Sequence, residues 1–356
     1  MYPLSSSDLA EHLADVEEVL EGFFTVAVER AGSRSSAYQQ LWEQLRHSAR
    51  GGKRLRPRLL VCSYVCLGGT DVHRAAFAAA AFELLHTALI VHDDVIDRDF
   101  VRRGMPNVSG SYRDKAHTAG LALPLAEHRG MGAAVIAGDL ALAGAYQLMR
   151  HATVDSERAE PLFALLDDAV YESAAGELVD LDFSLQHTTI ANVEDIVDME
   201  RLKTAVYSFE APLRAGAILA GASAETVRAL GLFGNHIGIA YQVVDDLLGV
   251  FGNETLTGKP VISDLREGKQ TVVIGFAATT PQWAEISERF GDPDLSVEAA
   301  DHIRALLIES GAKAQAEALA ARNADDARAV LNGPHIPARL RDSLIPLIDD
   351  AVERMR

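Results

Sequence analysis

The chain has 356 residues, with 51 acidic against 33 basic side chains and a formal net charge of −18. A chain this acidic repels phosphate backbones at long range, which argues against general nucleic-acid binding. Hydrophobic residues make up 48% of the chain but aromatic residues only 6%, a composition that favours helix over sheet. An anionic substrate would therefore need a local cluster of basic residues or a metal ion.

The N-terminal ten residues lack the basic and apolar regions of a secretory signal peptide. Cys62 and Cys66 have no histidine or cysteine nearby at metal-ligand spacing, so we interpret them as small buried residues. The most apolar window, 75–91, is interrupted by Glu83 and His86 and is too short to span a bilayer. We expect a cytoplasmic protein with no transmembrane segment.

Helical periodicity recurs from end to end, beginning with a helix that we expect Ser7 to cap. The other predicted helices cover residues 38–49, 58–66, 74–99, 130–150, 160–185, 192–220, 224–251, 297–331 and 337–356. The only strand signal is a short β-branched run at 271–276. No glycine-rich break is long enough to be a flexible linker. We predict one all-α domain over residues 1–356, built as a single large helical bundle.

An acidic motif, Asp93-Asp94-x-x-Asp97, ends the long apolar helix predicted at 74–99. At about 100° per residue, Asp93 and Asp97 share one helix face and Asp94 lies beside them. Three carboxylates at a helix C-terminus repel one another and the helix dipole unless a cation is bound. Oxygen ligands of this kind suit Mg²⁺, although a solvated acidic helix end is the alternative.

A second acidic pair, Asp245-Asp246, ends another long apolar helix about 150 residues later. Two such clusters indicate two walls of one metal-lined cavity. Basic residues that can grip phosphate stand near both motifs, although each alone is also typical of a solvated surface charge. They are Lys53 and Arg56, Arg102 and Arg103, Lys203, Lys259 and Lys269.

Together these pieces resemble the trans-polyprenyl diphosphate synthases. The ordered segments are Gly-Lys-Arg-Leu-Arg-Pro at 52–57, Glu-Leu-Leu-His at 83–86, the first acidic motif, Arg102-Arg103-Gly104-x-Pro106, Gly138-Asp139, Gly176-Glu177, Lys203-Thr204, Tyr241-Gln242-x-x-Asp245-Asp246, Gly258-Lys259 and Asp264-x-x-x-Gly268-Lys269-x-Thr271. The resemblance covers nearly the whole chain. One departure is Gly249, which stands where the second motif often has a third aspartate.

The resemblance implies an isoprenoid-synthase bundle around a central active-site cavity, usually a homodimer, that condenses isopentenyl diphosphate with an allylic diphosphate. It implies three Mg²⁺ ions per site on the allylic diphosphate, held by Asp93, Asp94, Asp97 and Asp245, with Asp246 assisting. Arg102, Lys203, Lys259 and Lys269 would grip that diphosphate. Lys53, Arg56, His86 and Arg103 would hold isopentenyl diphosphate. Thr204 and Gln242 would line the site near the reacting carbons.

In this family the product grows along the helix that leads to the first acidic motif. Bulky aromatic residues four and five positions before the first aspartate of that motif stop chain growth early. Here Leu89 and Ala88 occupy those positions. The next aromatic is Phe82, six residues before Ala88 or about 9 Å along the helix axis. This indicates geranylgeranyl diphosphate, with farnesyl or longer polyprenyl diphosphates as alternatives. Phe82 is alternatively a core residue, and Tyr146 or a partner-subunit residue is an alternative tunnel floor.

Three rival functions fit less well. A terpene cyclase shares the first acidic motif but has no use for Lys53, Arg56 and Arg103, and the usual Asn/Ser/Glu metal motif is absent from the sequence. A non-catalytic partner subunit usually loses its acidic motifs, and both are kept here. A metal phosphohydrolase is suggested only by His92-Asp93, with no second histidine cluster at suitable spacing.

Overall fold

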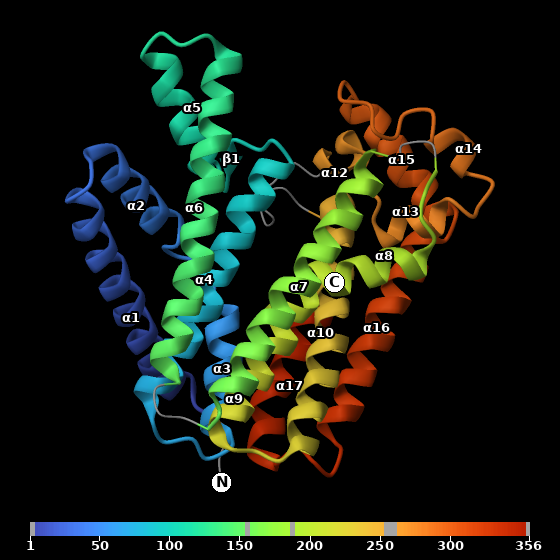
Figure 1. Cartoon of the computed structure of the whole chain (residues 1–356). Coiled ribbons are helices and arrows are strands. Elements are labelled where there is room, and N and C mark those ends of the chain that lie inside the picture. The colour runs from blue at the N-terminus through green and yellow to red at the C-terminus, as the bar shows by residue number, and fades with distance from the viewer. Residues whose placement is uncertain (1–3, 154–156, 186–188, 253–261, 354–356) are drawn as a thin grey trace. The chain divides into compact units, whose positions relative to one another are not determined.

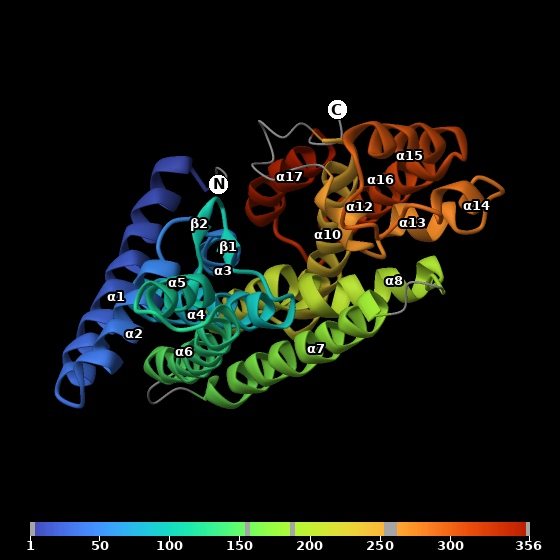
Figure 2. The same cartoon turned by 90° about the horizontal axis from the view of Figure 1, so that it is seen from above.

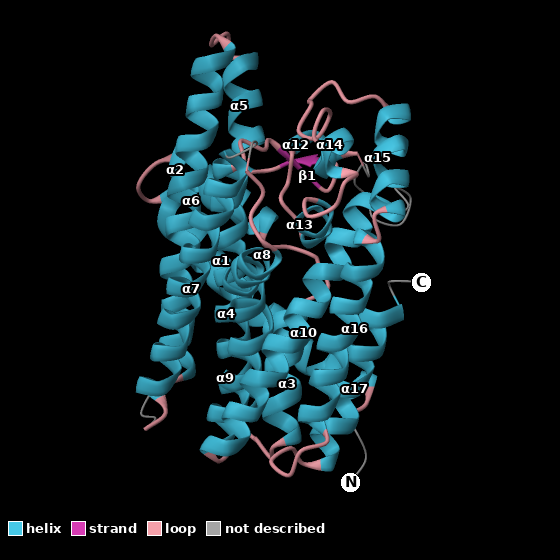
Figure 3. Cartoon of the chain, turned by 90° about the vertical axis from the view of Figure 1, so that its right-hand side faces the viewer, coloured by secondary structure: helices cyan, strands magenta, loops and turns pink. Residues whose placement is uncertain are grey.

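The computed structural model describes residues 4–153, 157–185, 189–252 and 262–353. Most of them are helical and the two strands are short, as Figure 3 shows, so the all-α class is confirmed. The chain divides into two compact units. The first contains Met1–Asp167 and Pro212–Val227, and the second contains Asp168–Ala211 and Arg228–Arg356. The expectation of one domain stays a prediction.

The first unit is built on α4 and α6, which run side by side (Figures 1 and 2). Alanines of α4 are almost wholly buried, because small side chains allow close helix packing. The elements of this unit are α1 (Ser6–Gly32), α2 (Ser36–Ser48), α3 (Leu55–Cys66), α4 (Val72–Ile96), β1 (Val101–Arg102), β2 (Met105–Pro106), α5 (Val108–Thr118) and α6 (Leu123–Ala152).

Three helices continue across the unit boundary in sequence: α7 (Ala159–Leu185), α9 (Ala211–Ala220) and α10 (Ala224–Phe251). The second unit holds the rest of α7 and α10 together with α8 (Val193–Glu200), the π-helix η1 (Arg201–Glu210), α12 (Ser263–Glu267), α13 (Val272–Ala277), α14 (Trp283–Ile286), α15 (Val297–Glu309), α16 (Ala312–Leu331) and α17 (Ala338–Glu353). Buried aliphatic residues of α10, α13, α15 and α16 form its core.

Three local predictions are wrong. Ser5 caps α1, since its side chain accepts a hydrogen bond from the amide of Asp8, and Ser7 lies inside the helix. The β-branched run at 271–276 forms helix α13, because burial on several faces overrides strand propensity. The helix expected at 297–331 is broken at Gly311, whose φ of 77° is left-handed and ends the helical path.

Two helices, α4 and α6, are long and apolar enough to cross a membrane by length and composition alone. This is weak evidence, because core helices of soluble proteins pass the same test. The most apolar stretch of α4 is 72% buried within the protein, whereas that of α6 is 39% buried. The α6 helix therefore carries an apolar surface that the described residues of this chain leave uncovered.

Candidate active site

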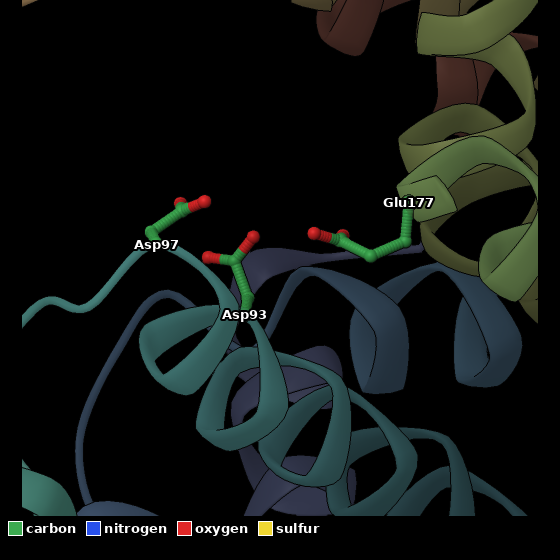
Figure 4. Close-up of side chains that lie close together, drawn as sticks. All are labelled: Asp93, Asp97 and Glu177. Atoms are coloured by element: carbon green, nitrogen blue, oxygen red, sulfur yellow. The ribbon is translucent and has the colours of Figure 1, made fainter. Parts of the chain in front are cut away.

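The first acidic motif lies at the C-terminal end of α4. Figure 4 shows the Asp93 and Asp97 carboxylates turned to the same side of the helix, and their oxygens approach within 4.8 Å of one another. This follows from the spacing of four residues, which places both side chains on one face. Asp94, by contrast, is only 3% exposed and points back toward the protein.

Arg102 on β1 pairs with this motif. Its Nη2 donates to Oδ2 of Asp93 at 2.9 Å, and its Nε donates to Oδ1 of Asp94 at 2.7 Å. The positive φ of Arg98, 56°, turns the chain directly after α4, and the strand β1 that follows carries Arg102, eight or nine residues beyond the carboxylates that it contacts. Arg102 therefore partly neutralises the carboxylates that the sequence assigns to metal binding.

The pKa of Asp94 is raised to about 6, because burial and the neighbouring charges of Asp93 and Asp99 outweigh the opposing effect of Arg102. Carboxylate oxygens crowded in this way are the donors that a hard divalent cation prefers. Asp93 and Asp97 offer the open face for such an ion. The residues present thus fit Mg²⁺.

A basic group lies on the same unit. Burial lowers the pKa of His86 well below its usual range, and the positive charges of Arg56, Arg102, Arg103 and Arg54 lower it further. His86 is therefore neutral near pH 7 and can donate one N–H to an anion. Arg54 and Arg102 are paired with carboxylates, so Arg56 and Arg103 are the arginines near His86 that can bind an anion with it.

Lys53 and Arg103, which the sequence assigns to the same anion, both have exposed side chains. A Cβ added to Gly52 would lie 3.7 Å from Nη1 of Arg103, so the β1–β2 hairpin and the turn before α3 lie close together. The first unit thus brings together the residues predicted for isopentenyl diphosphate.

In the second unit, Lys203 binds two acidic residues of α7. Its Nζ lies 3.1 Å from Oε2 of Glu177 and 2.6 Å from Oδ2 of Asp180. A Cβ at Gly176 would overlap the Lys203 backbone, so only glycine permits this close packing of α7 on η1. Lys203 and Thr204 belong to the π-helix, a geometry that often marks functional sites.

Asp246 of the second acidic motif forms a buried carboxyl pair with Glu200. Glu200 is 4% exposed and Asp246 is 2% exposed. If both carboxyl groups are ionised, Oε2 of Glu200 and Oδ2 of Asp246 have no hydrogen-bond donor among the described residues. Burial and the neighbouring charge of Asp246 raise the pKa of Glu200 well above its usual range. A proton on Glu200 lets it donate to Asp246, while Gln242 donates to Oδ1 of Asp246 at 3.1 Å.

Lys269 balances this pair. Burial acts to lower the pKa of Lys269, but the carboxylates of Asp246, Asp264 and Asp180 more than offset that effect, so the pKa is raised. Asp264 also explains the departure at Gly249, since a Cβ there would overlap the Asp264 carboxylate. The Asp264 carboxylate therefore occupies the space that a third aspartate side chain at position 249 would enter.

The remaining predicted residues are accounted for as follows. Asp245 is half-buried on α10. On α4, Phe82 and Ala88 are buried and Leu89 is half-buried. Lys259 lies outside the described residues. Tyr146, the alternative tunnel floor, donates to Oδ1 of Asp167 at 2.6 Å.

Sequence reasoning missed three residues as site members: Glu177, Asp180 and Glu200. Glu177 is drawn in Figure 4 and belongs to the second unit. Its spacing of three residues from Asp180, directly after Gly176, was an available signal for one acidic helix face. Nothing in the sequence distinguished Glu200 from a surface glutamate.

Comparison with known proteins agrees with this chemistry. A model of the polyprenyl synthetase family matches residues 38–307. The chain is 35% identical over 311 residues to the geranylfarnesyl diphosphate synthase of Aeropyrum pernix, covering 86% of this chain and 91% of that one. It is 39% identical over 226 residues to the geranylgeranyl diphosphate synthase of Sulfolobus acidocaldarius, covering 63% and 62%.

The structure is similar to that of geranylgeranyl pyrophosphate synthase from Corynebacterium glutamicum, which was crystallised with isoprenyl diphosphate and magnesium. The TM-score is 0.89 at 29% identity, covering 98% of this chain and 99% of that one. The helical fold agrees with these matches. The chain belongs to the polyprenyl synthetase family and is a chain-elongating trans-prenyltransferase.

Proposed function

We propose that the protein condenses isopentenyl diphosphate with an allylic diphosphate to make geranylgeranyl diphosphate. The observation that carries this proposal is the pairing, on one unit, of an acidic helix end with an anion-binding group. Asp93 and Asp97 offer oxygen ligands, and the positive charges of Arg56 and Arg103 act on His86. A terpene cyclase needs no second diphosphate site and would have no use for this arginine group.

We assign Mg²⁺ to Asp93, Asp94 and Asp97 on the first motif and to Asp245 on the second, with three ions per site as the expected number. When bound, Mg²⁺ supplies positive charge that stabilises the departing diphosphate. Asp93 and Asp94 already pair with a cation, Arg102, in the protein alone. This pairing supports a site whose carboxylates stabilise positive charge, as they would on a bound Mg²⁺ ion.

The side chains then have distinct roles. Arg102, Lys203, Lys259 and Lys269 bind the allylic diphosphate and stabilise it as its C–O bond ionises. Lys53, Arg56, His86 and Arg103 hold isopentenyl diphosphate so that its alkene faces the allylic cation. Thr204 and Gln242 line the site near the reacting carbons. The departing diphosphate then accepts the proton lost from the new chain.

The product length rests on α4. Phe82 lies seven residues before Leu89, so both occupy the face that also carries Asp93. Ala88 and Leu89 place no aromatic ring directly below the motif, and Phe82 is the first aromatic side chain beyond them. We therefore propose growth to C20 with Phe82 as the floor.

A product assay tests the function. Purified protein is incubated with Mg²⁺, isopentenyl diphosphate and the C5, C10 or C15 allylic diphosphate, and prenol lengths are read by chromatography. We expect a C20 product. A C15 product or one of C30 or more would keep the reaction and reject Phe82 as the floor. Folded protein with no condensation from any starter would reject the proposed function.

We also propose a cytoplasmic homodimer that pairs through α6. Leu125 is 61% exposed and Ile136 is 52% exposed, and their spacing of 11 residues places them on one helix face. Exposed apolar faces of this kind commonly mark interfaces. Light scattering should give a mass of two chains, and Ile136→Glu should shift it to one. A wild-type mass of one chain would reject the dimer.

A further inference from the structure

Arg54 is a buried cation for which the reaction has no assigned use. Its side chain is 9% exposed and its guanidinium contacts three separate elements. Nε and Nη2 donate to the two carboxylate oxygens of Glu17 on α1, the second bond being 2.9 Å long. Nη1 donates to the carbonyl oxygen of Ala49, directly after α2, at 2.9 Å and to Oε1 of Glu83 on α4 at 2.8 Å.

The backbone at Arg54 is equally constrained. Its φ of 51° lies in the left-handed region, as do those of Gly51 (78°) and Gly52 (84°). A non-glycine residue adopts this conformation only where surrounding contacts hold it there. The bonds to Glu17 and Glu83 are contacts of that kind. They keep the Arg54 side chain inside the unit while Lys53, the preceding residue, stays exposed.

Glu83 connects this turn to the anion-binding group. It lies three residues before His86 on α4, so the two side chains are neighbours one turn apart. Glu83 is itself 6% exposed, and its Oε2 has no hydrogen-bond partner among the described residues. A buried carboxylate in that position depends on the positive charge of Arg54. The pair therefore joins the turn that carries Lys53, together with the start of α3 that carries Arg56, to the helix that carries His86.

We propose that Arg54 is a positioning residue, which together with Glu17 and Glu83 fixes the turn so that Lys53 and Arg56 face the isopentenyl diphosphate that His86 and Arg103 also bind. We call these three residues the Arg54 clamp. This inference rests on the proposed function, because it assumes that Lys53 and Arg56 contact isopentenyl diphosphate. It assigns to the clamp no contact with either substrate.

The experiment compares Michaelis constants for the two substrates. Arg54→Lys keeps the charge but loses the forked geometry that binds Glu17 and Glu83 together. Arg54→Gly/Glu83→Gln removes the clamp without straining the backbone or leaving a buried charge. We expect both variants to raise the KM for isopentenyl diphosphate about tenfold or more, since displacements of about 1 Å in positioning groups reach a hundredfold. The KM for the allylic diphosphate should change less than about twofold, since no clamp residue reaches the acidic motif.

Two further variants make the result decisive. Arg58→Gln changes an exposed arginine one turn along α3 and should leave both Michaelis constants unchanged. Lys53→Ala tests whether Lys53 binds isopentenyl diphosphate.

If Lys53→Ala raises the KM for isopentenyl diphosphate and the folded clamp variants do not, the clamp proposal is wrong and the proposed function stands. If the clamp variants raise both constants equally, the clamp acts on general stability and the inference is wrong. If Lys53→Ala has no effect, the isopentenyl site is misassigned and the clamp is rejected with it.

Discussion

The two acidic clusters, one on each unit, balance their charge in different ways. On the first unit, Asp93 and Asp94 pair with Arg102, which lies only eight or nine residues further along the chain. On the second unit, Glu177 and Asp180 pair with Lys203, more than twenty residues away, and a buried Glu200–Asp246 pair lies beside Lys269. The first cluster is formed by residues close together in the sequence, whereas helix packing assembles the second from residues far apart in the sequence. Substitutions in the second should therefore affect folding as well as turnover.

The largest expected effect is that of Asp93→Ala. It removes an oxygen ligand and a partner of Arg102, so we expect turnover to fall about 100- to 1,000-fold, as when other charge-stabilising groups are deleted. The fold should survive, because Asp93 is only half-buried at a helix end. Turnover at saturating Mg²⁺ and circular dichroism provide the measurement. Asp114→Ala, which changes an exposed aspartate of α5, is the control, and wild-type turnover in Asp93→Ala would remove that residue from the site.

Lys203→Ala tests the second acidic cluster, in which Lys203 pairs with Glu177 and Asp180. It should lower turnover about 100-fold, because the diphosphate loses a cation. It should also lower the free energy of unfolding by about 1–3 kcal/mol, because Glu177 and Asp180 lose their partner. Arg102→Ala should lower turnover to a similar extent, but it should lower the free energy of unfolding less than Lys203→Ala does. Urea unfolding and steady-state kinetics separate the two, with Lys313→Ala on the surface as control. An equal loss of unfolding free energy in Lys203→Ala and Arg102→Ala would contradict the proposed difference between the two acidic clusters.

Gly176→Ala tests the close packing of α7 on η1. The added methyl group would overlap the Lys203 backbone, and we expect the free energy of unfolding to fall by about 1–3 kcal/mol. Gly22→Ala on α1 meets no atom within 4 Å and should instead be neutral or stabilising. Urea denaturation measures both. A neutral Gly176→Ala would show that α7 and η1 have room to separate.

The smallest effect concerns His86 and pH. Burial and the arginines that face it, Arg56, Arg102, Arg103 and Arg54, lower its pKa in the folded state, so the unfolded chain binds the proton more tightly. The stabilisation is complete above the unfolded pKa of about 6.5 and is lost as the pH falls below it, at no more than about 1.4 kcal/mol per pH unit. His86→Gln should therefore lose less stability than the wild type between pH 7 and 5. Parallel curves for the two proteins would reject a neutral His86.

Much of the fold was predictable from sequence, and the misses share a cause. Long helices such as α4 and α10 are long apolar segments, and both end close to the predicted residues. The β-branched run at 271–276 misled because strand propensity is a weak preference that burial in α13 overrides. The β1–β2 hairpin escaped notice because two residues per strand leave no periodic signal.

For the candidate site, the sequence alone determined the acidic motifs and the basic segments beside them. Such chemistry depends on residue type and on spacing of three or four residues along one helix. Only the tertiary structure decided that Arg102 pairs with Asp93 and Asp94, that Lys203 pairs with Glu177 and Asp180, and that Arg54 joins α1, α2 and α4. Ion pairs form between side chains that packing brings within about 4 Å, and the distance along the chain does not determine which helices pack together.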